Sequence, residues 1–273
     1  MRLSRLGEVG LLAELEQRGL IVGVEHDAAQ LAGGLVVTQD ALVEGVHFRL
    51  DWLSWRELGY RAAAVNLSDL AASGATPDAL VVTLAAPAAT EAERIVELYE
   101  GIAEARVPVV GGDTSSAAQV VISVTALGRS ERVPGRAGAK PGDVLVVTGP
   151  LGGSGAAFRH GRYVRPPIRS EEGRLLAARA HAMIDISDGL AVDAGHIAGR
   201  SRVRCVLDLD TVPLAEGATV DDLGFGEDFE LLAAVRSADG LPVIGRVEAG
   251  QGLELLRGGA PSALRGYEHF ARP

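Results

Sequence analysis

Residues 55–74 read WRELGYRAAAVNLSDLAASG, and this uninterrupted stretch predicts a long helix that ends at Gly74. Asn66 and Asp69 are three residues apart in this helix, so their side chains share one face. A carboxylate among small and apolar residues needs a partner, because burying a lone charge is costly. The helix is therefore predicted to contribute Asp69 to a functional site.

Predicted strands and helices alternate on both sides of this helix. Further helices are predicted at residues 7–18, 91–106, 155–159 and 171–180. Strands are predicted at residues 35–40, 79–87, 107–115, 119–129, 143–149, 204–210, 229–235 and 242–247, and residues 182–199 read as strand, turn and helix. This alternation is typical of an α/β (or α+β) protein with two sub-domains. The Pro- and Gly-rich stretch 134–142 divides the chain into domains of residues 1–137 and 138–273.

The composition excludes several classes of function. Lys and Arg total 26 against 36 Asp and Glu, so the formal charge is −10, and a nucleic-acid binder, which needs a basic surface, is not expected. No apolar stretch reaches membrane-spanning length, and no basic start precedes an apolar core, so we expect a cytoplasmic protein without membrane contact. The single cysteine, Cys205, lies in an apolar strand and is predicted to be buried and inert.

Six aspartates stand in stretches of small or apolar residues, where a lone charge is unfavourable. They are Asp27, Asp40, Asp69, Asp113, Asp185 and Asp188. Lys and Arg residues nearby are too few to pair with all six. Mg²⁺ takes oxygen ligands and bridges to phosphates, and bound cations reconcile an acidic protein with anionic ligands. The sequence therefore predicts a multi-metal enzyme that acts on phosphates.

Two glycine-rich stretches are candidate ligand loops. In VVGGDTS (109–115) the glycines permit a close approach of backbone to a ligand, with Asp113 as a metal ligand, although a turn that closes a hairpin explains the motif equally well. TGPLGGSGAA (148–157) lacks the residues of both common nucleotide-binding loops. We expect it to form a close-packed turn from a strand into a helix.

The motif MIDISDGL (183–190) combines a strand end with a helix start. Ser187 or Asp188 is suited to capping the helix that begins at Gly189. A cap does not account for Asp185, which shares one side of an extended segment with Ser187. A helix N-terminus beside two carboxylates suits a phosphate that is bridged by metal ions.

Two further motifs are open between a structural and a functional role. His47 follows Asp40 by seven residues in DALVEGVHF and suits contact with a phosphate or pyrimidine, but a lone histidine is more often structural. GFGEDFELL (224–232) places Glu227 and Asp228 between glycines and a strand. An exposed acidic turn is the alternative for this second motif.

Taken in this order, the motifs resemble thiamine-monophosphate kinase. The matching segments are HDAA, TQDALVEGVHF, AVNLSDLAASGATP, GGDT, GRAGAKPGD, IDISDGL, GEDFELL, IGRV and GYEHF, which span residues 26–270. The resemblance implies the fold shared with aminoimidazole ribonucleotide synthetase, in which two α/β sub-domains are present and N-terminal strands pair across a homodimer. It also implies transfer of the γ-phosphate of ATP to thiamine monophosphate with several Mg²⁺ ions, a reaction that needs positioning and charge neutralisation more than a nucleophile.

The resemblance assigns a role to each matching residue. Metal-site positions are Asp27, Thr38, Asp40, Asp69, Asp113, Asp185 and Asp188. Positions that contact ATP are Gly112, Asp113, Arg136 and Ser187. Positions that face the thiamine substrate are His47, Glu227 and Tyr267. No residue receives a covalent catalytic role.

The chain departs from the family pattern at four places. His26 replaces the first aspartate of the family's I-G-D-D, Gln39 replaces a threonine before Asp40, and Ser73 replaces a methionine. The stretch between the glycine loop and Met183 is short for the family. His26 and Gln39 are both expected near the metal ions, so we expect activity with an altered Mg²⁺ dependence.

Two other functions are alternatives. The first is another ATP-using enzyme of the same fold, although the chain lacks the N-terminal cysteine of selenophosphate synthetases and the C-terminal cysteine of the hydrogenase maturation protein. The second is a non-catalytic protein that binds nucleotide or thiamine phosphate. The replacements His26 and Gln39 motivate this second alternative.

Overall fold

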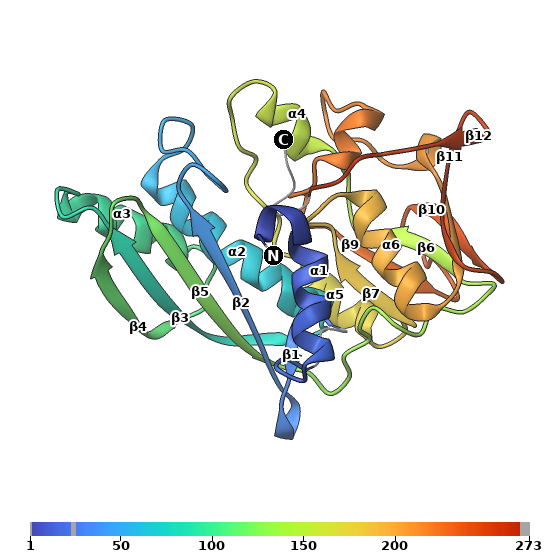
Figure 1. The fold of residues 1–273 in the computed structure, drawn as a ribbon, viewed down its shortest axis with the longest axis horizontal. Helices are drawn as coiled ribbons and strands as arrows, with labels where there is room; N and C mark the ends of the chain where they lie inside the picture. Colours follow the sequence, from blue (N-terminus) through green and yellow to red (C-terminus); the bar gives the residue numbers. More distant parts are fainter. Residues whose placement is uncertain (1, 23–25, 268–273) are drawn as a thin grey trace.

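Two mixed β-sheets lie on either side of helix α2 (Trp55–Ala72), which runs through the middle of the molecule (Figure 1). The computed structural model describes residues 2–22 and 26–267. Residues 29–129 build the first sheet, and residues 144–262 build the second. Strands and helices alternate in both parts, so the predicted α/β class is confirmed.

The first sheet has five strands in the order β1-β2-β5-β3-β4. Their bounds are Ala29–Gln30 (β1), Leu35–Val43 (β2), Thr76–Ala86 (β3), Val109–Ser116 (β4) and Val121–Arg129 (β5). β3 and β4 pair in parallel, because helix α3 (Ala92–Ala103) connects them as a crossover. β4 is at the end of this order, and all eight of its residues are exposed.

The second sheet has seven strands in the order β12-β11-β8-β10-β6-β9-β7. Their bounds are Val144–Val147 (β6), Ala182–Asp185 (β7), Arg204–Asp208 (β8), Leu231–Val235 (β9), Val243–Glu248 (β10), Gly252–Arg257 (β11) and Ala260–Ser262 (β12). The remaining helices are Leu3–Gln17 (α1), Gly153–Phe158 (α4), Ser170–Ala177 (α5) and Leu190–Ser201 (α6), with short 3₁₀ turns at Ala32–Gly34, Leu209–Thr211 and Val220–Gly224. Among the described residues, no helix combines the length and apolar character that a membrane crossing needs.

The centre of the second sheet is buried on both faces. Along β9, Leu232 and Ala234 join the core cluster that includes α6, whereas the alternate residues join a cluster that includes α5 and the end of α2. Ala71 and Ala72 of α2 belong to this second cluster, whereas the larger apolar residues of the helix, Leu58, Leu67 and Leu70, pack on the first sheet. Helix α2 therefore joins the two halves of the molecule and carries its side chains to the boundary between them.

Small residues let α2 and α3 pack closely. A Cβ atom on Gly59 of α2 would lie 1.8 Å from the carbonyl oxygen of Leu98, and one on Gly101 of α3 would lie 1.9 Å from that of Arg56. Both distances are impossible for real atoms, so neither helix tolerates a side chain at this crossing. The close contact fixes the position of α2 against the first sheet.

The helices and strands agree with the predicted ones at some places and differ at others. Helix α2 ends as predicted, with Gly74 in the left-handed region (φ 62) and its N–H donated to the carbonyl of Ala71. The predicted turn in GGDTS is wrong, because β4 continues through these residues to Ser116. Strands β11 and β12 were not predicted. Residues 130–143 connect the sheets without a helix or strand, and the domain division at 137/138 within them stays a prediction.

Cys205 lies in β8 and is fully buried, as predicted. Burial raises the pKa of its thiol to about 11. A thiol with a raised pKa forms little of the reactive thiolate at neutral pH. Cys205 therefore belongs to the core rather than to a redox or metal site.

Candidate functional site

Five of the six predicted aspartates converge where the two sheets meet at α2. Asp40 comes from β2, Asp69 from α2, and Asp27 from the segment before β1, while Asp185 ends β7 and Asp188 lies in the loop that follows. The pKa of Asp69 is raised well above its usual value, first by burial and then by the charges of Asp40, Asp185 and Asp27. The pKa of Asp40 is raised to about 6 by burial and by the charge of Asp188. We call these five residues the carboxylate cluster.

Three polar residues of helix α2, Asn66, Ser68 and Asp69, make hydrogen bonds to other residues of this site. The Asn66 amide oxygen accepts the backbone N–H of Asp40 at 2.9 Å. The Asp69 carboxylate accepts the Thr38 hydroxyl at 2.5 Å, so Asn66 and Asp69 share a face as predicted, and this face meets β2. Ser68 donates its hydroxyl to Asp185 at 2.6 Å, across the boundary between the two halves.

One cation lies within the carboxylate cluster. Nε and Nη2 of Arg136 both donate to one oxygen of Asp27, at 2.8 and 2.6 Å. Burial nevertheless raises the pKa of Asp27, although Arg136 acts to lower it. The pKa of Asp185 is raised to about 8 by burial and then by the charge of Asp27. The Arg136 guanidinium therefore does not offset the burial and repulsion of Asp27 and Asp185.

The cluster suits hard divalent cations. Among residues 2–22 and 26–267, no three His, Cys, Asp or Glu side chains already stand in metal-binding geometry. The carboxylates instead contact Arg136, Thr38 and Ser68. Their oxygen atoms, their burial and their unbalanced negative charge are the properties that Mg²⁺ requires of a site. Ions that bind here would displace protons and reorient these side chains.

The two replacements that were expected near the metal ions, His26 and Gln39, lie in different places. His26 precedes Asp27, and its Nδ1 atom is buried without a hydrogen-bond partner. A Cβ on Gly135 would lie 2.2 Å from this Nδ1, so the glycine makes room for the imidazole. Gln39 is exposed and donates to the Ser123 hydroxyl at 2.9 Å on the neighbouring strand. The expectation that Gln39 lies near the metal ions is therefore wrong, because strand alternation turns it away from the face of Asp40.

Asp113 does not join the carboxylate cluster within this chain. It lies on β4, which is separated from β2 by two strands, so it is roughly 14 Å from Asp40 across the sheet. A Cβ on the neighbouring Gly112 would lie 1.8 Å from the carbonyl oxygen of Val82. The missing side chain of Gly112 is thus required by the adjacent strand, and the contact of Gly112 and Asp113 with ATP stays a prediction.

The backbone before α6 is held by a residue that the sequence did not indicate. The N-cap position is Gly189, which has no side chain, so the expectation that Ser187 or Asp188 caps this helix is wrong. Asp193, one turn into α6, instead accepts the backbone N–H groups of Asp188 and Gly189 at 3.2 and 3.1 Å. Asp193 therefore fixes the backbone just before the helix, and the N–H groups of the first turn, from Leu190 onward, are not its partners. The expectation of a phosphate at this helix end stays a prediction.

Glu227 and Tyr267 meet beside the loop of Asp188. Glu227 donates its N–H to the carbonyl of Ser187 at 2.8 Å, and Tyr267 donates its N–H to the carbonyl of Asp188 at 2.9 Å. His47 comes from the connection between β2 and α2, where its Nδ1 accepts the N–H of Val43 at 3.0 Å. Two of the three predicted substrate residues are thus adjacent to the carboxylate cluster.

The GEDFELL segment is not an exposed acidic turn. Asp228 is buried and accepts the N–H groups of Gly152 and Ser154 at 2.7 and 3.3 Å, at the start of α4. The 148–157 loop is therefore a close-packed strand-to-helix turn, as predicted, and a carboxylate occupies its helix N-terminus. Glu227 has a left-handed backbone (φ 57), which is uncommon for a side-chain-bearing residue and often marks a functional site.

Sequence reasoning missed three residues of the site. Ser68 holds Asp185, Asp193 holds the backbone before α6, and Arg61 of α2 forms an ion pair with Glu227. Arg61 carried a usable signal, because it is a charged residue in an otherwise small and apolar part of α2. Ser68 and Asp193 carried none, since their partners are remote in sequence or depend on the exact helix start.

The chain is similar to known proteins along most of its length. The family model for the N-terminal domain of AIR synthase related proteins matches residues 25–130. The thiamine-monophosphate kinase of Rhodopirellula baltica is 40% identical, over 84% of this chain and 80% of the relative. The corresponding kinase of Mycobacterium tuberculosis is 35% identical, over 99% of this chain and 94% of the relative.

A solved structure matches the fold described above. AaThiL complexed with AMPPCP and TMP has a TM-score of 0.90 at 31% identity, and the match covers 98% of this chain and 99% of that chain. The sequence relatives and this structure agree with the two-sheet α/β fold. The chain belongs to the thiamine-monophosphate kinase family.

Proposed function

We propose that the protein transfers the γ-phosphate of ATP to the phosphate of thiamine monophosphate, which yields thiamine diphosphate and ADP. The observation that carries this proposal is the convergence of Asp40 and Asp69 from the first half of the chain with Asp185 and Asp188 from the second. Oxygen donors grouped in this way suit Mg²⁺, which binds phosphates. Family membership and the likeness to a structure that holds AMPPCP and TMP support the choice of both substrates.

The chain acts by binding and alignment, because phosphoryl transfer needs little covalent chemistry from the protein. Mg²⁺ ions, when bound at the carboxylate cluster, would supply the positive charge that lets two phosphate groups approach each other. Thr38 and Ser68 hold Asp69 and Asp185 and so limit the orientations of these carboxylates. No general base is required, because the attacking phosphate oxygen is already ionised.

The remaining assignments follow the position of each residue. Arg136 stands beside Asp27 and is suited to exchange this carboxylate for a phosphate of ATP. Ser187 lies in the loop between Asp185 and α6 and stays a candidate for contact with ATP. Glu227 and Tyr267, with His47, are candidates for contact with the thiamine moiety. The use of ATP favours the cytoplasm as the location of this enzyme.

We also infer that two copies form a homodimer through β4. An exposed edge strand presents unpaired N–H and C=O groups, which pair readily with another strand. The neighbouring Val109 and Val110 of β4 are 37% and 65% exposed, so apolar side chains accompany these unpaired groups along the edge. β1 covers only Val36 and Val37 of β2, so the part of β2 that carries Asp40 is the other free edge of this sheet. Pairing of β4 with this edge of a second copy would carry Asp113 toward the partner's carboxylate cluster, which explains its distance from the cluster of its own chain.

Mixing two inactive variants tests this arrangement. We expect Asp113→Ala and Asp69→Asn to be inactive alone, and to regain activity when the two are unfolded and refolded together. In a mixed dimer one site would retain Asp69 and receive Asp113 from the other copy. A dimer by analytical ultracentrifugation without any recovery would contradict the exchange of Asp113, and a monomer would contradict the dimer.

The reaction itself is tested by phosphorus NMR of the protein with ATP, excess Mg²⁺ and thiamine monophosphate, beside a control without the acceptor. We expect thiamine diphosphate and ADP to appear together and only in the complete mixture. ADP and free phosphate without thiamine diphosphate would contradict the acceptor and favour another enzyme of this fold. Binding of ATP without its consumption would favour the non-catalytic alternative that His26 motivates.

A further inference from the structure

The connection between the two sheets runs past β7 and the C-terminal end of α6. Residues 130–143 form this connection and have no helix or strand, so their backbone polar groups need partners on neighbouring elements. The carbonyl of Gly135 accepts the N–H of Met183 in β7 at 2.8 Å. The next residues contact Ser201, which is the last residue of α6. We call residues 135–139, which are held between β7 and α6, the Arg136 loop.

The Ser201 hydroxyl makes three hydrogen bonds to the backbone of this loop. It accepts the N–H groups of Gly138 and Ala139, both at 3.1 Å, and donates to the carbonyl of Arg136 at 3.2 Å. A serine hydroxyl has one hydrogen and two lone pairs, so these three contacts use its whole capacity. One side chain therefore fixes the backbone on both sides of Ala137.

Two glycines allow the Arg136 loop to pack closely on its neighbours. Gly138 has a φ of 116, and a Cβ atom there would lie 2.5 Å from the carbonyl oxygen of His181. Gly135 has a φ of 67, and a Cβ atom there would overlap the imidazole of His26. Positive φ angles without room for a Cβ atom suit glycine alone. The loop therefore follows a close-packed course, from which the Arg136 side chain departs.

The Arg136 residue is held at both of its ends. Its guanidinium donates twice to Asp27 of the carboxylate cluster, and its backbone carbonyl accepts the Ser201 hydroxyl. When a phosphate of ATP takes the place of Asp27 beside the guanidinium, the backbone contacts are the ones that remain. A residue that is held before its ligand arrives loses less conformational freedom on binding. Ser201 is therefore placed to affect the affinity for ATP through Arg136.

Helix α6 also links the Arg136 loop to the second candidate ATP residue, Ser187. In the first turn of the helix, Asp193 accepts the N–H groups of residues 188 and 189, which follow Ser187 directly. At the other end, Ser201 holds the Arg136 loop. Asp193 and Ser201 are eight residues apart, which is about 12 Å along a helix axis. One helix therefore sets the spacing of the two loops that are predicted to contact ATP.

We propose that Ser201 is a positioning residue for ATP, because its hydroxyl fixes the Arg136 loop in the place where the Arg136 guanidinium meets a phosphate of the nucleotide. The inference rests on the proposed function and adds to it a residue that acts through Arg136. Loss of the hydroxyl leaves three backbone groups without their partner and gives the loop freedom that ATP binding must then remove. The acceptor is affected less, because the candidate acceptor residues His47 and Glu227 lie on other segments.

Equilibrium dialysis with AMPPCP and Mg²⁺, without any acceptor, tests this role apart from catalysis. We expect Ser201→Ala to raise the Kd for AMPPCP by roughly tenfold, and Ser201→Thr, which keeps the hydroxyl, to recover most of the loss. Ser201→Cys keeps a weak donor of similar size, so it should give an intermediate Kd and replaces Ser201→Ala if that variant does not fold. An unchanged Kd in these variants would overturn the proposal.

Ser130→Ala is the matched control for the loss of a hydroxyl from this region. The Ser130 hydroxyl also donates to a carbonyl of the connection, that of Arg132 at 2.9 Å, but it does not contact the Arg136 loop. The Kd for AMPPCP should therefore stay the same in Ser130→Ala. A rise equal to that of Ser201→Ala would contradict a specific role for Ser201.

A double-mutant cycle distinguishes positioning of Arg136 from a general effect on the fold. Arg136→Ala removes the guanidinium, so a further Ser201→Ala change should add little to its Kd for AMPPCP. A residue that only stabilises the fold would weaken binding by the same factor with and without the guanidinium. Equal and additive effects of the two substitutions would therefore overturn the proposal.

Steady-state kinetics separate this proposal from the proposed function. Ser201→Ala should raise the KM for ATP by a similar factor and leave kcat and the KM for thiamine monophosphate nearly unchanged, and equal rises in both KM values would contradict the role. Absence of thiamine diphosphate from the unmodified protein would refute the kinase, but the dialysis needs no acceptor and still decides the role of Ser201. An unmodified protein that binds no AMPPCP would overturn both.

Discussion

Asp185 gives a prediction whose sign differs between the metal-free and the metal-bound protein. Burial and the charge of Asp27 raise the pKa of Asp185 from 3.8 to about 8 in the folded chain. The unfolded chain loses this proton near its ordinary pKa, so stability is full below about pH 4 and is lost as the pH rises toward 8. At about 1.4 kcal/mol per pKa unit, the cost near pH 8 is on the order of 5 kcal/mol.

The substitution Asp185→Asn removes this cost and keeps the contact with Ser68, because an amide oxygen also accepts the hydroxyl. We expect the melting temperature of the metal-free variant near pH 8 to exceed that of the unmodified protein by roughly 10 °C. Near pH 4 the difference should be small, since the folded side chain is then protonated and the unfolded one is about half protonated. With saturating Mg²⁺ the order should reverse, because the variant lacks one charged ligand.

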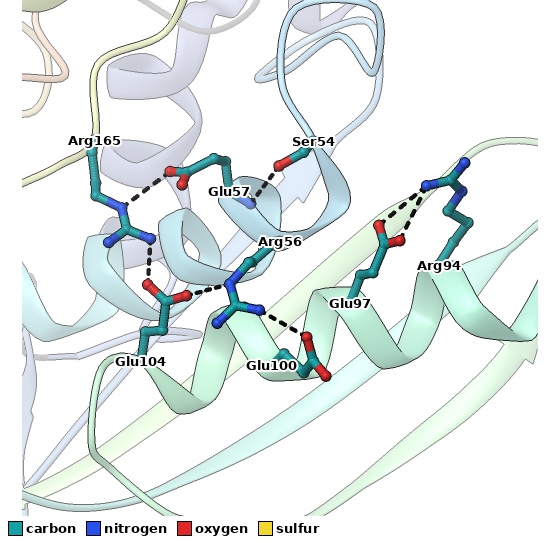
Figure 2. Close-up of polar contacts among 8 residues, drawn as sticks. All are labelled: Ser54, Arg56, Glu57, Arg94, Glu97, Glu100, Glu104 and Arg165. Atoms are coloured by element: carbon teal, nitrogen blue, oxygen red, sulfur yellow. Dashed lines mark hydrogen bonds and ion pairs between the residues drawn. The ribbon is translucent and has the colours of Figure 1, made fainter.

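Calorimetry near both pH values, with chelator and with Mg²⁺, measures all of these changes. Glu97→Gln is the matched control, because Glu97 is a partly exposed carboxylate on α3 that pairs with Arg94 (Figure 2). Its melting temperature should move little under each condition. A metal-free Asp185→Asn protein that melts lower than the unmodified protein near pH 8, and that keeps the full stabilisation by Mg²⁺, would refute the reasoning.

Three further predictions address other parts of the site. Ser68→Ala should raise the Mg²⁺ concentration for half-maximal activity by roughly 10- to 100-fold, since Asp185 loses its orienting hydroxyl; an unchanged Mg²⁺ titration would contradict this. Gly112→Ala should lower the melting temperature and disturb the pairing of β3 and β4, because its Cβ would overlap the Val82 carbonyl; an unchanged calorimetric trace would count against it. Glu227→Gln should raise the KM for thiamine monophosphate by roughly tenfold and leave that for ATP unchanged, and equal effects on both would refute a thiamine-specific role.

The convergence of the carboxylate cluster could be anticipated, because each aspartate conflicts with its local surroundings. Asp69 in a small-residue helix and Asp185 at the end of an apolar strand both require a partner, whatever the tertiary fold. The face shared by Asn66 and Asp69 follows from helical periodicity alone. These features were therefore visible in the sequence, and the structure adds which strand and loop they meet.

The position of Asp113 could not be anticipated in the same way. Its motif is local, but its distance from Asp40 depends on the strand order β2-β5-β3-β4, which no local pattern encodes. Gln39 is a different case, because strand alternation places it opposite Thr38 and Asp40 and so predicts that it turns away. The expectation that Gln39 lies near the metal ions gave weight to sequence adjacency instead.

The position of Asp193 and the contact between Trp52 and Tyr163 show where longer-range contacts decide the local structure. Asp193 accepts the N–H groups of Asp188 and Gly189 just before helix α6, an arrangement that depends on the precise helix start. Trp52 lies beside Tyr163, which comes more than a hundred residues later in the chain. Only the course of the irregular connection between α4 and α5 determines that contact.

The measurement that tests the central claim most directly is the rate of thiamine diphosphate formation as a function of Mg²⁺ concentration, in the unmodified protein and in Asp69→Asn. Asp78→Asn is the control, since Asp78 is exposed and pairs with Arg129 at 3.0 Å away from the cluster. The account predicts a Mg²⁺-dependent rate in the unmodified protein and in Asp78→Asn, and its near-complete loss in Asp69→Asn. A Mg²⁺ dependence that is the same in all three proteins would contradict the assignment of the carboxylate cluster as the metal site.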